Sequence, residues 1–286
     1  EAWYVPVGDD PCGVAGEFKA VLENPETLKI GQNMKYDLQV LRSCGIRLAG
    51  PMFDTMIAHY LLHPEMRHGM DYLAEAYLNY QTIHIEELIG TGKRQRSMAD
   101  VPAQDVCPYA AEDADVTLRL RNVFAPQLEA EGCTALFRDI EMPLMPVLAQ
   151  MERNGVRIDT LGLEETSALY TRQMQQMEQE IHEMAGMQFN VSSPRQVGEV
   201  LFDQLHLSRK AKKTKTGQYV TSEEVLESLR PKHPIVGKIL EYRGLKKLLS
   251  TYIDALPLLV NSRTGHIHTS FNQTVTATGR LSSSNP

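Results

Sequence analysis

A tyrosine and an aspartate four residues apart form the pair in this chain whose spacing most suggests chemistry. Tyr109 and Asp113 belong to the segment 109–120, whose residues are mostly compatible with a helix. On a helix this spacing stacks the two side chains one turn apart on the same face. A phenol beside a carboxylate can orient a water molecule on a bound metal ion. Taken alone, the pair also fits a plainer interpretation, in which Asp113 is an early-turn acid favoured by the helix dipole and Tyr109 is a packing aromatic.

A second acid, Asp37, lies near the start of another expected helix. It closes the segment 31–37 (GQNMKYD), which follows a short β-like stretch. The apolar residues Leu38, Val40 and Leu41 come next, with the periodicity of a helix. Asp37 and the pair at 109 and 113 are therefore expected on two different helices.

The elements that must position these residues are typical of an α/β domain over the first 127 residues or so, where short apolar runs alternate with helices. The strand candidates are residues 2–7 and 28–30. Pro6 would place the first at a sheet edge or a strand end, because proline cannot donate a ladder hydrogen bond. Asp54 is the expected N-cap of a helix over 55–62, and Gly45 is expected to end the helix that follows Asp37.

The second half of the chain turns almost wholly helical. Apolar residues recur at helical spacing from Leu163 to Met184, before Gly186, and again from Ile235 to Leu256. The pattern predicts two long amphipathic helices that pack as an antiparallel stalk. Two capping-box candidates, 193–196 and 221–224, are each expected to open a short helix between them. The lysine-rich loop between the short helices would then lie at the tip of the stalk.

Charge is distributed unevenly along the chain. The total is −7, which argues against nucleic-acid binding by the whole surface. Residues 206–250 hold eleven Lys and Arg but four Asp and Glu, a net +7 that leaves −14 for the rest. An acidic body thus carries one basic segment suited to holding a phosphate backbone, although a solvated lysine-rich loop is the alternative.

Composition describes a soluble globular chain. With 286 residues and 42% hydrophobic content, it can build one large or two ordinary domains. A membrane span and a signal peptide are not expected, because the sequence has no apolar run of about 18 residues and no basic, apolar beginning. The four cysteines, at 12, 44, 107 and 133, lack a Cys-x-x-Cys pair. They are expected to be reduced packing residues of a cytosolic protein.

Several segments together resemble bacterial family A DNA polymerases. Segments 31–37 and 109–113 resemble the second and third motifs of the 3′ to 5′ proofreading exonuclease domain. Segments 140–144, 152–156, 241–245 and 276–283 resemble, in this order, the start of the polymerase region, its thumb and the start of its palm. Because the order holds across nearly the whole chain, the chain is identified as an internal fragment of such a polymerase.

The resemblance implies an α/β domain followed by all-α segments. Residues 1–135 would form an RNase H-like 3′ to 5′ exonuclease domain that lacks its first strand and motif. Residues 136–265 would form the polymerase thumb and connecting helices, and residues 266–286 the start of the palm.

The resemblance also implies a two-metal site. Phosphodiester hydrolysis by two Mg²⁺ or Mn²⁺ ions needs several carboxylates that hold the ions about 4 Å apart. Of the family's four acids, Asp37 matches the one in the second motif and Asp113 the one in the third, while Tyr109 matches the tyrosine that orients the attacking water. The other two belong to an Asp-x-Glu motif, and no Asp-x-Glu occurs before Asp37. The two-metal site is therefore expected to be incomplete.

Other residues near these motifs are left outside the site. Glu112 and Asp115 are turned about 100° and 200° from Asp113 by helical spacing. His59 and His63 have a metal-like spacing, but the accompanying glutamate of a His-Glu-x-x-His zinc motif is missing. Both histidines are expected to be surface or packing residues.

Contacts with DNA are expected at three places. A residue of the second motif would help bind the DNA end. Lysines of the basic loop and a basic stripe at i, i+3 and i+4 would contact phosphates without reading sequence. A palm arginine would sense the primer terminus. The candidate DNA-binding residues are Asn33, Lys212, Lys213, Lys215, Arg243, Lys246, Lys247 and Arg280.

The implied parent is a monomeric polymerase of the bacterial cytoplasm, associated with the nucleoid. Its partners would be primer–template duplex, a single-stranded 3′ end and deoxynucleoside triphosphates, and it would excise mispaired 3′ ends. The palm aspartates that catalyse polymerisation in the family would lie beyond residue 286, so the fragment itself is expected to bind DNA weakly and to show little nuclease activity. The alternatives are a stand-alone 3′ to 5′ exonuclease and a non-catalytic DNA-binding module with a degenerate exonuclease fold.

Overall fold

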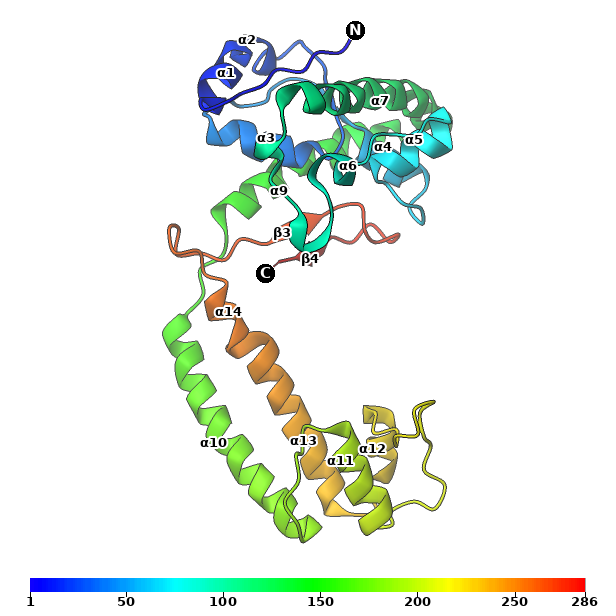
Figure 1. The fold of residues 1–286 in the computed structure, drawn as a ribbon, viewed down its shortest axis with the longest axis vertical. Coiled ribbons are helices and arrows are strands. Elements are labelled where there is room, and N and C mark those ends of the chain that lie inside the picture. Colours follow the sequence, from blue (N-terminus) through cyan, green and yellow to red (C-terminus); the bar gives the residue numbers. More distant parts are fainter. Residues whose placement is uncertain (286) are drawn as a thin grey trace. The chain divides into compact units, whose positions relative to one another are not determined.

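The computed structural model describes residues 1–285, and the chain divides into two compact units. The first unit comprises Glu1–Gly155 and His268–Pro286, and the second comprises Val156–Ile267. In Figure 1 the first unit contains the blue, cyan and red parts of the ribbon, and the second contains α10 to α14. The functional boundaries near 135 and 265 stay a prediction.

The first unit is a set of helices around one small parallel sheet. Its helices are α1 (Pro11–Glu17), α2 (Lys19–Leu22), α3 (Met34–Ser43), α4 (Thr55–Leu62), α5 (Met70–Leu78), α6 (Ile85–Ile89), α7 (Ala103–Ala130), α8 (Thr134–Leu136) and α9 (Met142–Asn154). Short 3-10 turns η1 (Gly92–Arg94) and η2 (Met98–Asp100) precede α7, and a π-helical turn η3 (Phe137–Glu141) precedes α9. The strands are β1 (Lys29–Gly31), β2 (Met52–Asp54), β3 (Ser270–Asn272) and β4 (Ser282–Ser284).

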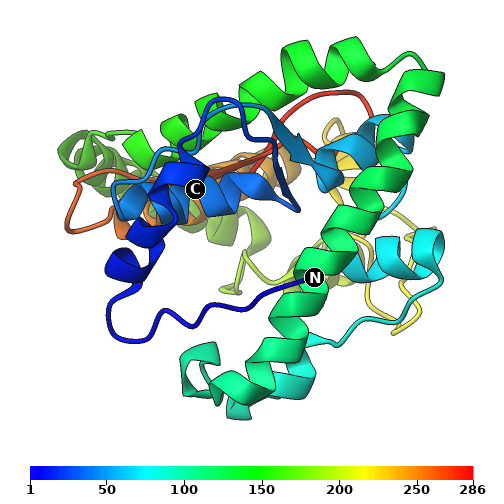
Figure 2. The ribbon, with the colours of Figure 1, turned by 90° about the horizontal axis from the view of Figure 1, so that it is seen from above.

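The parallel pair β1 and β2 forms the α/β element of the unit. Lys29 pairs with Met52, Ile30 with Phe53, and Gly31 with Asp54, so both strands end beside the starts of α3 and α4. Strands β3 and β4 pair in antiparallel fashion. The long helix α7 packs against α4, α5 and β1, and Figure 2 shows it running past the cyan α5.

The strand predicted over residues 28–30 is present as β1, but the strand predicted over 2–7 is wrong. Residues 2–7 form no strand, and Trp3, Val5 and Val7 are exposed, with 80% of Trp3 accessible to solvent. A strand forms only where a partner supplies hydrogen bonds, and Pro6 has no N–H to contribute. The apolar alternation therefore predicted a strand that residues 2–7 do not form.

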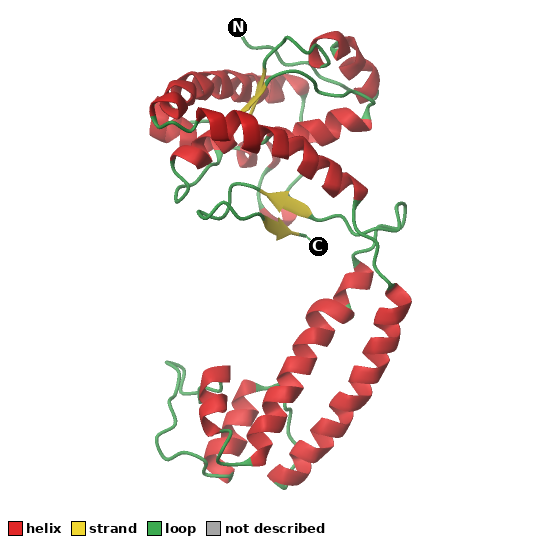
Figure 3. Ribbon diagram, turned by 180° about the vertical axis from the view of Figure 1, so that it is seen from behind, coloured by secondary structure: helices red, strands yellow, loops and turns green. Residues whose placement is uncertain are grey.

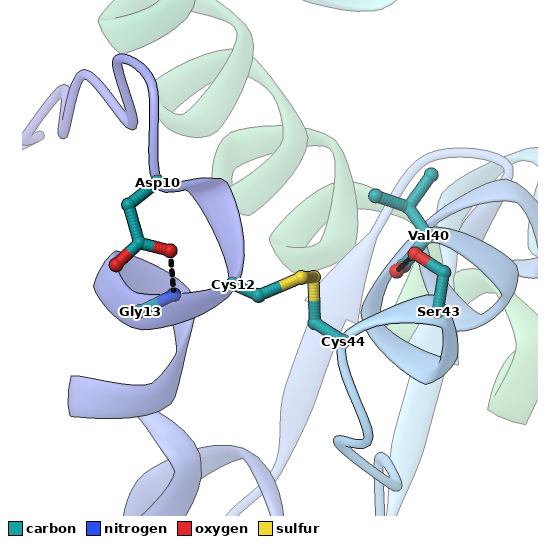
Figure 4. The surroundings of a disulfide bond; sticks show 6 residues. All are labelled: Asp10, Cys12, Gly13, Val40, Ser43 and Cys44. Atoms are coloured by element: carbon teal, nitrogen blue, oxygen red, sulfur yellow. Dashed lines mark hydrogen bonds between the residues drawn. A yellow bond between two sulfur atoms is a disulfide. The ribbon is translucent and has the colours of Figure 1, made fainter.

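A disulfide overturns the prediction that all four cysteines are reduced packing residues. Cys12 in α1 and Cys44 at the end of α3 are bonded, with Cα atoms 4.9 Å apart (Figure 4). Cys12 is exposed and Cys44 half-buried, whereas Cys107 is an exposed thiol. The fold brings together two cysteines that are 32 residues apart in sequence, a pairing that sequence alone cannot give.

The core of the first unit joins α7 to the sheet and to α4, α5 and α9. Val116, Leu120 and Phe124 form the buried stripe of α7, at the spacing expected of one helical face. They pack in one cluster with Phe53 of β2 and Met145 of α9. This core fixes α7, and with it the segment 109–113, against the sheet that precedes α3.

The second unit is a helical hairpin with smaller helices at one end. Its elements are α10 (Thr160–Ala185), α11 (Pro194–Gly198), the π-helical turn η4 (Glu199–Gln204), α12 (Glu223–Leu229), α13 (Pro234–Leu248), the π-helical turn η5 (Leu249–Ile253) and α14 (Ala255–Leu258). Figure 3 shows α10 and the α13–η5 helix as an antiparallel pair. The predicted stalk is therefore confirmed, and α10 ends at Gly186, whose φ of +69° suits glycine.

The short helices α11 and α12 form where they were expected, but neither carries the full predicted capping box. Ser193 caps α11 by accepting a hydrogen bond from the Gln196 N–H, and Ser222 caps α12 without a side-chain bond. Gln196 instead accepts from the Asn190 N–H at 2.6 Å. Apolar side chains of α10, α11, η4, α12 and α13 share one core that includes Ile181, Leu201 and Ile239. Across residues 1–285 no helix is both long enough and apolar enough to cross a membrane.

Candidate functional site

Helix α3, which carries Asp37, begins at a residue in the left-handed region. Asn33 has φ +59° and ψ +47°, a conformation that asparagine adopts more readily than most residues. The backbone N–H groups of Asn33 and Met34 both donate to the carboxylate of Asp54, at 3.2 and 2.7 Å. The last residue of β2 therefore holds the first turn of α3.

The same carboxylate also caps α4. Asp54 accepts from the N–H groups of Met56 at 2.8 Å and Ile57 at 3.3 Å, which confirms its predicted N-cap role. Its side chain is buried, and a single buried carboxylate satisfies four backbone donors from two helix starts. The sequence indicates only the cap of α4, because nothing local to Asp54 points to the start of α3.

Asp37 lies in the first turn of α3 and has a raised pKa. Loss of hydration is the main cause, and the nearby charge of Asp54 adds to it, so the pKa of Asp37 rises to about 6. The residue is exposed, although neighbouring protein atoms remove part of the water around its carboxyl group. A carboxylate with this tendency to hold a proton is one that a cation would stabilise.

Asp113 and Tyr109 lie on α7, as the four-residue spacing predicts. Burial raises the pKa of Asp113 to about 6, and the charges of Glu112 and Asp71 contribute less. Burial likewise raises the pKa of Tyr109, followed by the charge of Asp113. The two residues lie one turn apart on α7, and both are half-buried.

Asp37 and Asp113 line one hollow in the first unit. The hollow has a volume of about 440 Å³ and is lined by residues of β1, α3, α5 and α7. Its lining residues are Ile30, Gly31, Gln32, Asp37, Met70, Asp113, Ala114, Thr117 and Leu118. Tyr109 is outside this set. Two acids from separate helices thus line the same hollow.

The oxygen donors of this hollow fit a hard divalent cation, but they are few. Carboxylates are the ligands that Mg²⁺ and Mn²⁺ prefer. Among residues 1–285 no group of three or more His, Cys, Asp or Glu is close enough to hold a metal ion. The role of Asp37 and Asp113 toward a metal ion therefore stays a prediction.

The two acids that flank Asp113 are engaged elsewhere. Glu112 accepts from the Tyr80 hydroxyl at 2.6 Å and from the Ile83 N–H at 2.7 Å. Asp115 forms an exposed i, i+4 ion pair with Arg119 at 3.5 Å. Both contacts agree with leaving these residues outside the site.

Histidines 59 and 63 have the packing and surface roles that were expected. His59 is buried, with its Nδ1 2.7 Å from Nδ1 of His68 and its Nε2 2.9 Å from the Tyr77 hydroxyl. Burial, followed by the neighbouring His68 and His63, lowers the pKa of His59 to about 4. His63 is exposed.

Asn33 does not share the hollow of Asp37 and Asp113. It lines a second, smaller hollow with Asp54, Met145 and residues of the turn after β3. The predicted contact of Asn33 with a DNA end stays a prediction.

The three lysines of the basic loop lie on an ordered hairpin-like turn of the second unit. The Val220 N–H donates to the Lys212 carbonyl at 2.9 Å, and the Thr214 N–H donates to the Gln218 carbonyl at 2.7 Å. The Lys213 ammonium lies 4.3 Å from the centre of the Tyr219 ring. All three lysines, 212, 213 and 215, are exposed, and their contact with phosphates stays a prediction.

The basic stripe of α13 is less uniform than its spacing suggests. Arg243 is half-buried and donates to the carbonyl and hydroxyl oxygens of Thr221, at 2.6 and 3.3 Å. Burial lowers the pKa of this guanidinium. Lys246 and Lys247 are exposed, and the Lys246 ammonium donates to the Ser192 hydroxyl. Arg243 thus connects α13 to the start of α12, and its role toward DNA stays a prediction.

Arg280 is exposed on the turn between β3 and β4. The Thr276 hydroxyl donates to the Arg280 carbonyl, and Gly279 adopts φ +76° within the turn. The Tyr60 hydroxyl of α4 donates to the Thr276 carbonyl at 2.8 Å. The turn that presents Arg280 is therefore attached to α4.

Two family models match the chain. Residues 5–129 match a model described as 3′-5′ exonuclease, and residues 160–286 match one described as DNA polymerase family A. The first match contains the hollow with Asp37 and Asp113, and the second contains the lysine loop and Arg280.

The chain is also similar to whole proteins and to a solved structure. It is 44% identical to DNA polymerase I of Pseudomonas aeruginosa over 100% of the chain and 33% of that protein, and 38% identical to the Bacillus subtilis one over 100% and 32%. It matches the POL domain of Pol1 from M. smegmatis, in complex with DNA primer-template and dNTP, at a TM-score of 0.79 and 31% identity over 95% of the chain and 44% of that domain. The chain spans about a third of the length of these curated relatives.

Proposed function

Because the chain belongs to DNA polymerase family A and contains its 3′–5′ exonuclease domain, we propose that it is part of a DNA polymerase that proofreads its own product. The first unit would remove mispaired 3′ ends, and the second would grip duplex DNA. The parent would extend primers from deoxynucleoside triphosphates.

The observation that carries the proposal is the hollow shared by Asp37 and Asp113. The two residues come from separate helices, and they are the acids expected from the second and third exonuclease motifs. In a degenerate exonuclease fold, neither acid would be needed beside this hollow. This favours the proofreading function over a non-catalytic DNA-binding module.

The chemistry assigned to the hollow is phosphodiester hydrolysis. Bound Mg²⁺ or Mn²⁺ ions would supply charge neutralisation and a water molecule of lowered pKa. Asp37 and Asp113 would hold the ions through their carboxylate oxygens, and Tyr109 would orient the attacking water with its hydroxyl. Because the pKa of each acid is raised to about 6, both would be ionised above that pH and would lose cation affinity below it.

The second unit supplies a surface for the phosphate backbone. Lys212, Lys213 and Lys215 project from one ordered turn, and Lys246 and Lys247 lie on α13. Such contacts position DNA without reading its sequence, so we expect binding to depend on salt rather than on base composition.

Further parts of the proposal follow from the family. The exonuclease unit would have an RNase H-like fold, with Arg280 at the primer terminus and Asn33 at the excised end. The parent would act as a monomer in the bacterial cytoplasm, close to the nucleoid, with primer–template DNA and nucleotides as partners. In that compartment the Cys12–Cys44 pair would meet cellular thiols that can reduce it.

The test is a pair of measurements on the purified 286-residue chain. Anisotropy of a labelled primer–template should report weak binding that falls as salt rises, and a 5′-labelled single strand with Mg²⁺ should be digested slowly or not at all. Binding that ignores salt would contradict the DNA-gripping role. Robust 3′ to 5′ digestion would contradict the incomplete metal site and favour a stand-alone exonuclease.

A further inference from the structure

Glu152 is a buried acid of α9 that lies outside the catalytic hollow. It is 7% exposed, and its carboxylate receives donors from two other elements. From α3, the Lys35 ammonium and the Gln39 side-chain amide both donate to it. From β3, the Phe271 N–H donates at 2.7 Å. A buried charge with this many donors is fixed in position.

The contacts close into a ring that joins three elements. The Lys35 ammonium donates both to Glu152 and to the Phe271 carbonyl, while Glu152 accepts from Lys35 and from the Phe271 N–H. His268 contacts the same residue of α9, since its Nδ1 lies 2.8 Å from the Glu152 carbonyl oxygen. Helix α3 is thereby attached to α9 and to β3 by polar contacts.

The attachment lies on the face of α3 opposite to Asp37. Lys35 and Gln39 are two residues before and two residues after Asp37, so each is turned by roughly 160° from it at about 100° per residue. Fixing this face fixes the rotation of α3 about its own axis. That rotation decides how far the Asp37 carboxylate reaches into the hollow with Asp113.

We infer that Glu152, acting through Lys35 and Gln39, is a positioning residue for the metal-holding carboxylate of Asp37. Glu152 does not line the hollow, and it acts by holding α3 at one rotation. The inference rests on the proposed exonuclease function, because it assigns the purpose of the contacts to that site.

The test compares glutamine truncations that change no charge. Mn²⁺ alone is titrated into the 286-residue chain, and free Mn²⁺ is followed by electron paramagnetic resonance. Gln39→Ala, which removes one bond to Glu152, should weaken Mn²⁺ affinity roughly threefold to tenfold, less than is usual for a residue bonded directly to a metal ligand. The matched control is Gln273→Ala, since Gln273 is also buried and also bonds a glutamate, but its side-chain amide donates to Glu141 and not to the Glu152 that holds α3. It should leave the affinity within twofold.

Lys35→Gln separates position from charge. Removing a positive charge near a cation site would strengthen Mn²⁺ binding if only electrostatics mattered. A shift of α3 would weaken binding instead, and this is the expected result. Tighter binding by Lys35→Gln, or unchanged binding by Gln39→Ala in a folded chain, would overturn the inference. If Lys35→Gln does not fold, Gln39→Ala decides alone, because it leaves the ion pair intact.

A failure of the proposed function would be seen in the Mn²⁺ affinity of a different variant, Asp37→Asn. Asp37→Asn should abolish Mn²⁺ binding, and unchanged binding in that variant would contradict the metal site itself. When Asp37→Asn abolishes binding and Gln39→Ala does not change it, the metal site stands and only the positioning role is lost.

Discussion

At the scale of residues, the positions of Asp37 and Asp113 lower the free energy of unfolding of the metal-free chain at neutral pH. The pKa of Asp37 is raised from 3.8 to about 6, so the folded chain holds the proton more tightly than the unfolded chain. Between these pH values the unfolded state loses its proton first as pH rises. The free energy of unfolding therefore falls as pH rises through this window.

Replacing Asp37 with Asn should consequently stabilise the metal-free chain at neutral pH. We expect a gain of about 1 kcal/mol at pH 8, discounted for the exposure of Asp37, and none below about pH 4. Urea denaturation in the presence of a chelator at both pH values measures it. Asp115→Asn, an exposed acid of α7, is the control and should change stability by less than about 0.5 kcal/mol. A loss of stability in Asp37→Asn at pH 8 would contradict the assignment.

Asp54 is a residue whose loss should be felt in two helices. Its buried carboxylate satisfies four backbone donors at the starts of α3 and α4. Asp54→Ala should lower the free energy of unfolding by about 3 kcal/mol or more, since a single cap is worth about 1 kcal/mol and unsatisfied buried donors add to the cost. Asp159→Ala removes the exposed cap of α10 and should cost only about 1 kcal/mol. Equal losses in chemical denaturation would argue against the double cap.

At the scale of elements, α1 depends on its disulfide. The helix buries none of its residues, and Cys12 bonds it to Cys44 at the end of α3 (Figure 4). A loop of this length, closed across a separation of 32 residues, stabilises a fold by about 3 to 4 kcal/mol in the chain-entropy view.

Reducing the Cys12–Cys44 disulfide and replacing Cys12 should therefore lower the melting temperature by a similar amount. Cys12→Ser should lower the melting temperature of the oxidised chain, and dithiothreitol should lower that of the unchanged chain to a similar value. Cys107→Ser, which alters an exposed free thiol, is the control. The disulfide would be refuted by a melting temperature of the unchanged chain that does not respond to dithiothreitol.

The lysine loop should determine how the second unit responds to salt. Each phosphate contact contributes about 0.9 to the slope of log affinity against log salt, so replacing Lys212, Lys213 and Lys215 with Ala should reduce the slope by up to about 3. Lys238→Ala is the control, because Lys238 is paired with Glu180 at 2.7 Å. Anisotropy with primer–template DNA at several salt concentrations gives both slopes. An unchanged slope in the triple variant would place the DNA contact elsewhere.

At the scale of the whole molecule, local signals predicted more than non-local ones. Gly186 ends α10 and Asp54 caps α4 because such signals act within one turn of the chain. The strand expected at residues 2–7 and the reduced state of Cys12 were wrong, because both depend on what the fold brings alongside.

The candidate site could be predicted only in part, because spacing relates only residues that are close in sequence. Tyr109 and Asp113 share a helix, so their spacing was sufficient to pair them. That Asp113 shares a hollow with Asp37 was expected from the family resemblance and not from spacing, since α3 and α7 are distant in sequence. The contacts of Glu152 with α3 and β3 join three segments that no sequence pattern relates.

The central claim is that Asp37 and Asp113 belong to one metal site. A double-mutant cycle measured by Mn²⁺ titration tests it most directly, with the unchanged chain, Asp37→Asn, Asp113→Asn and the double variant compared at pH 8. We expect each single variant to lose nearly all Mn²⁺ affinity and the double variant to lose no more. Additive losses, or a single variant that binds Mn²⁺ as well as the unchanged chain, would contradict it.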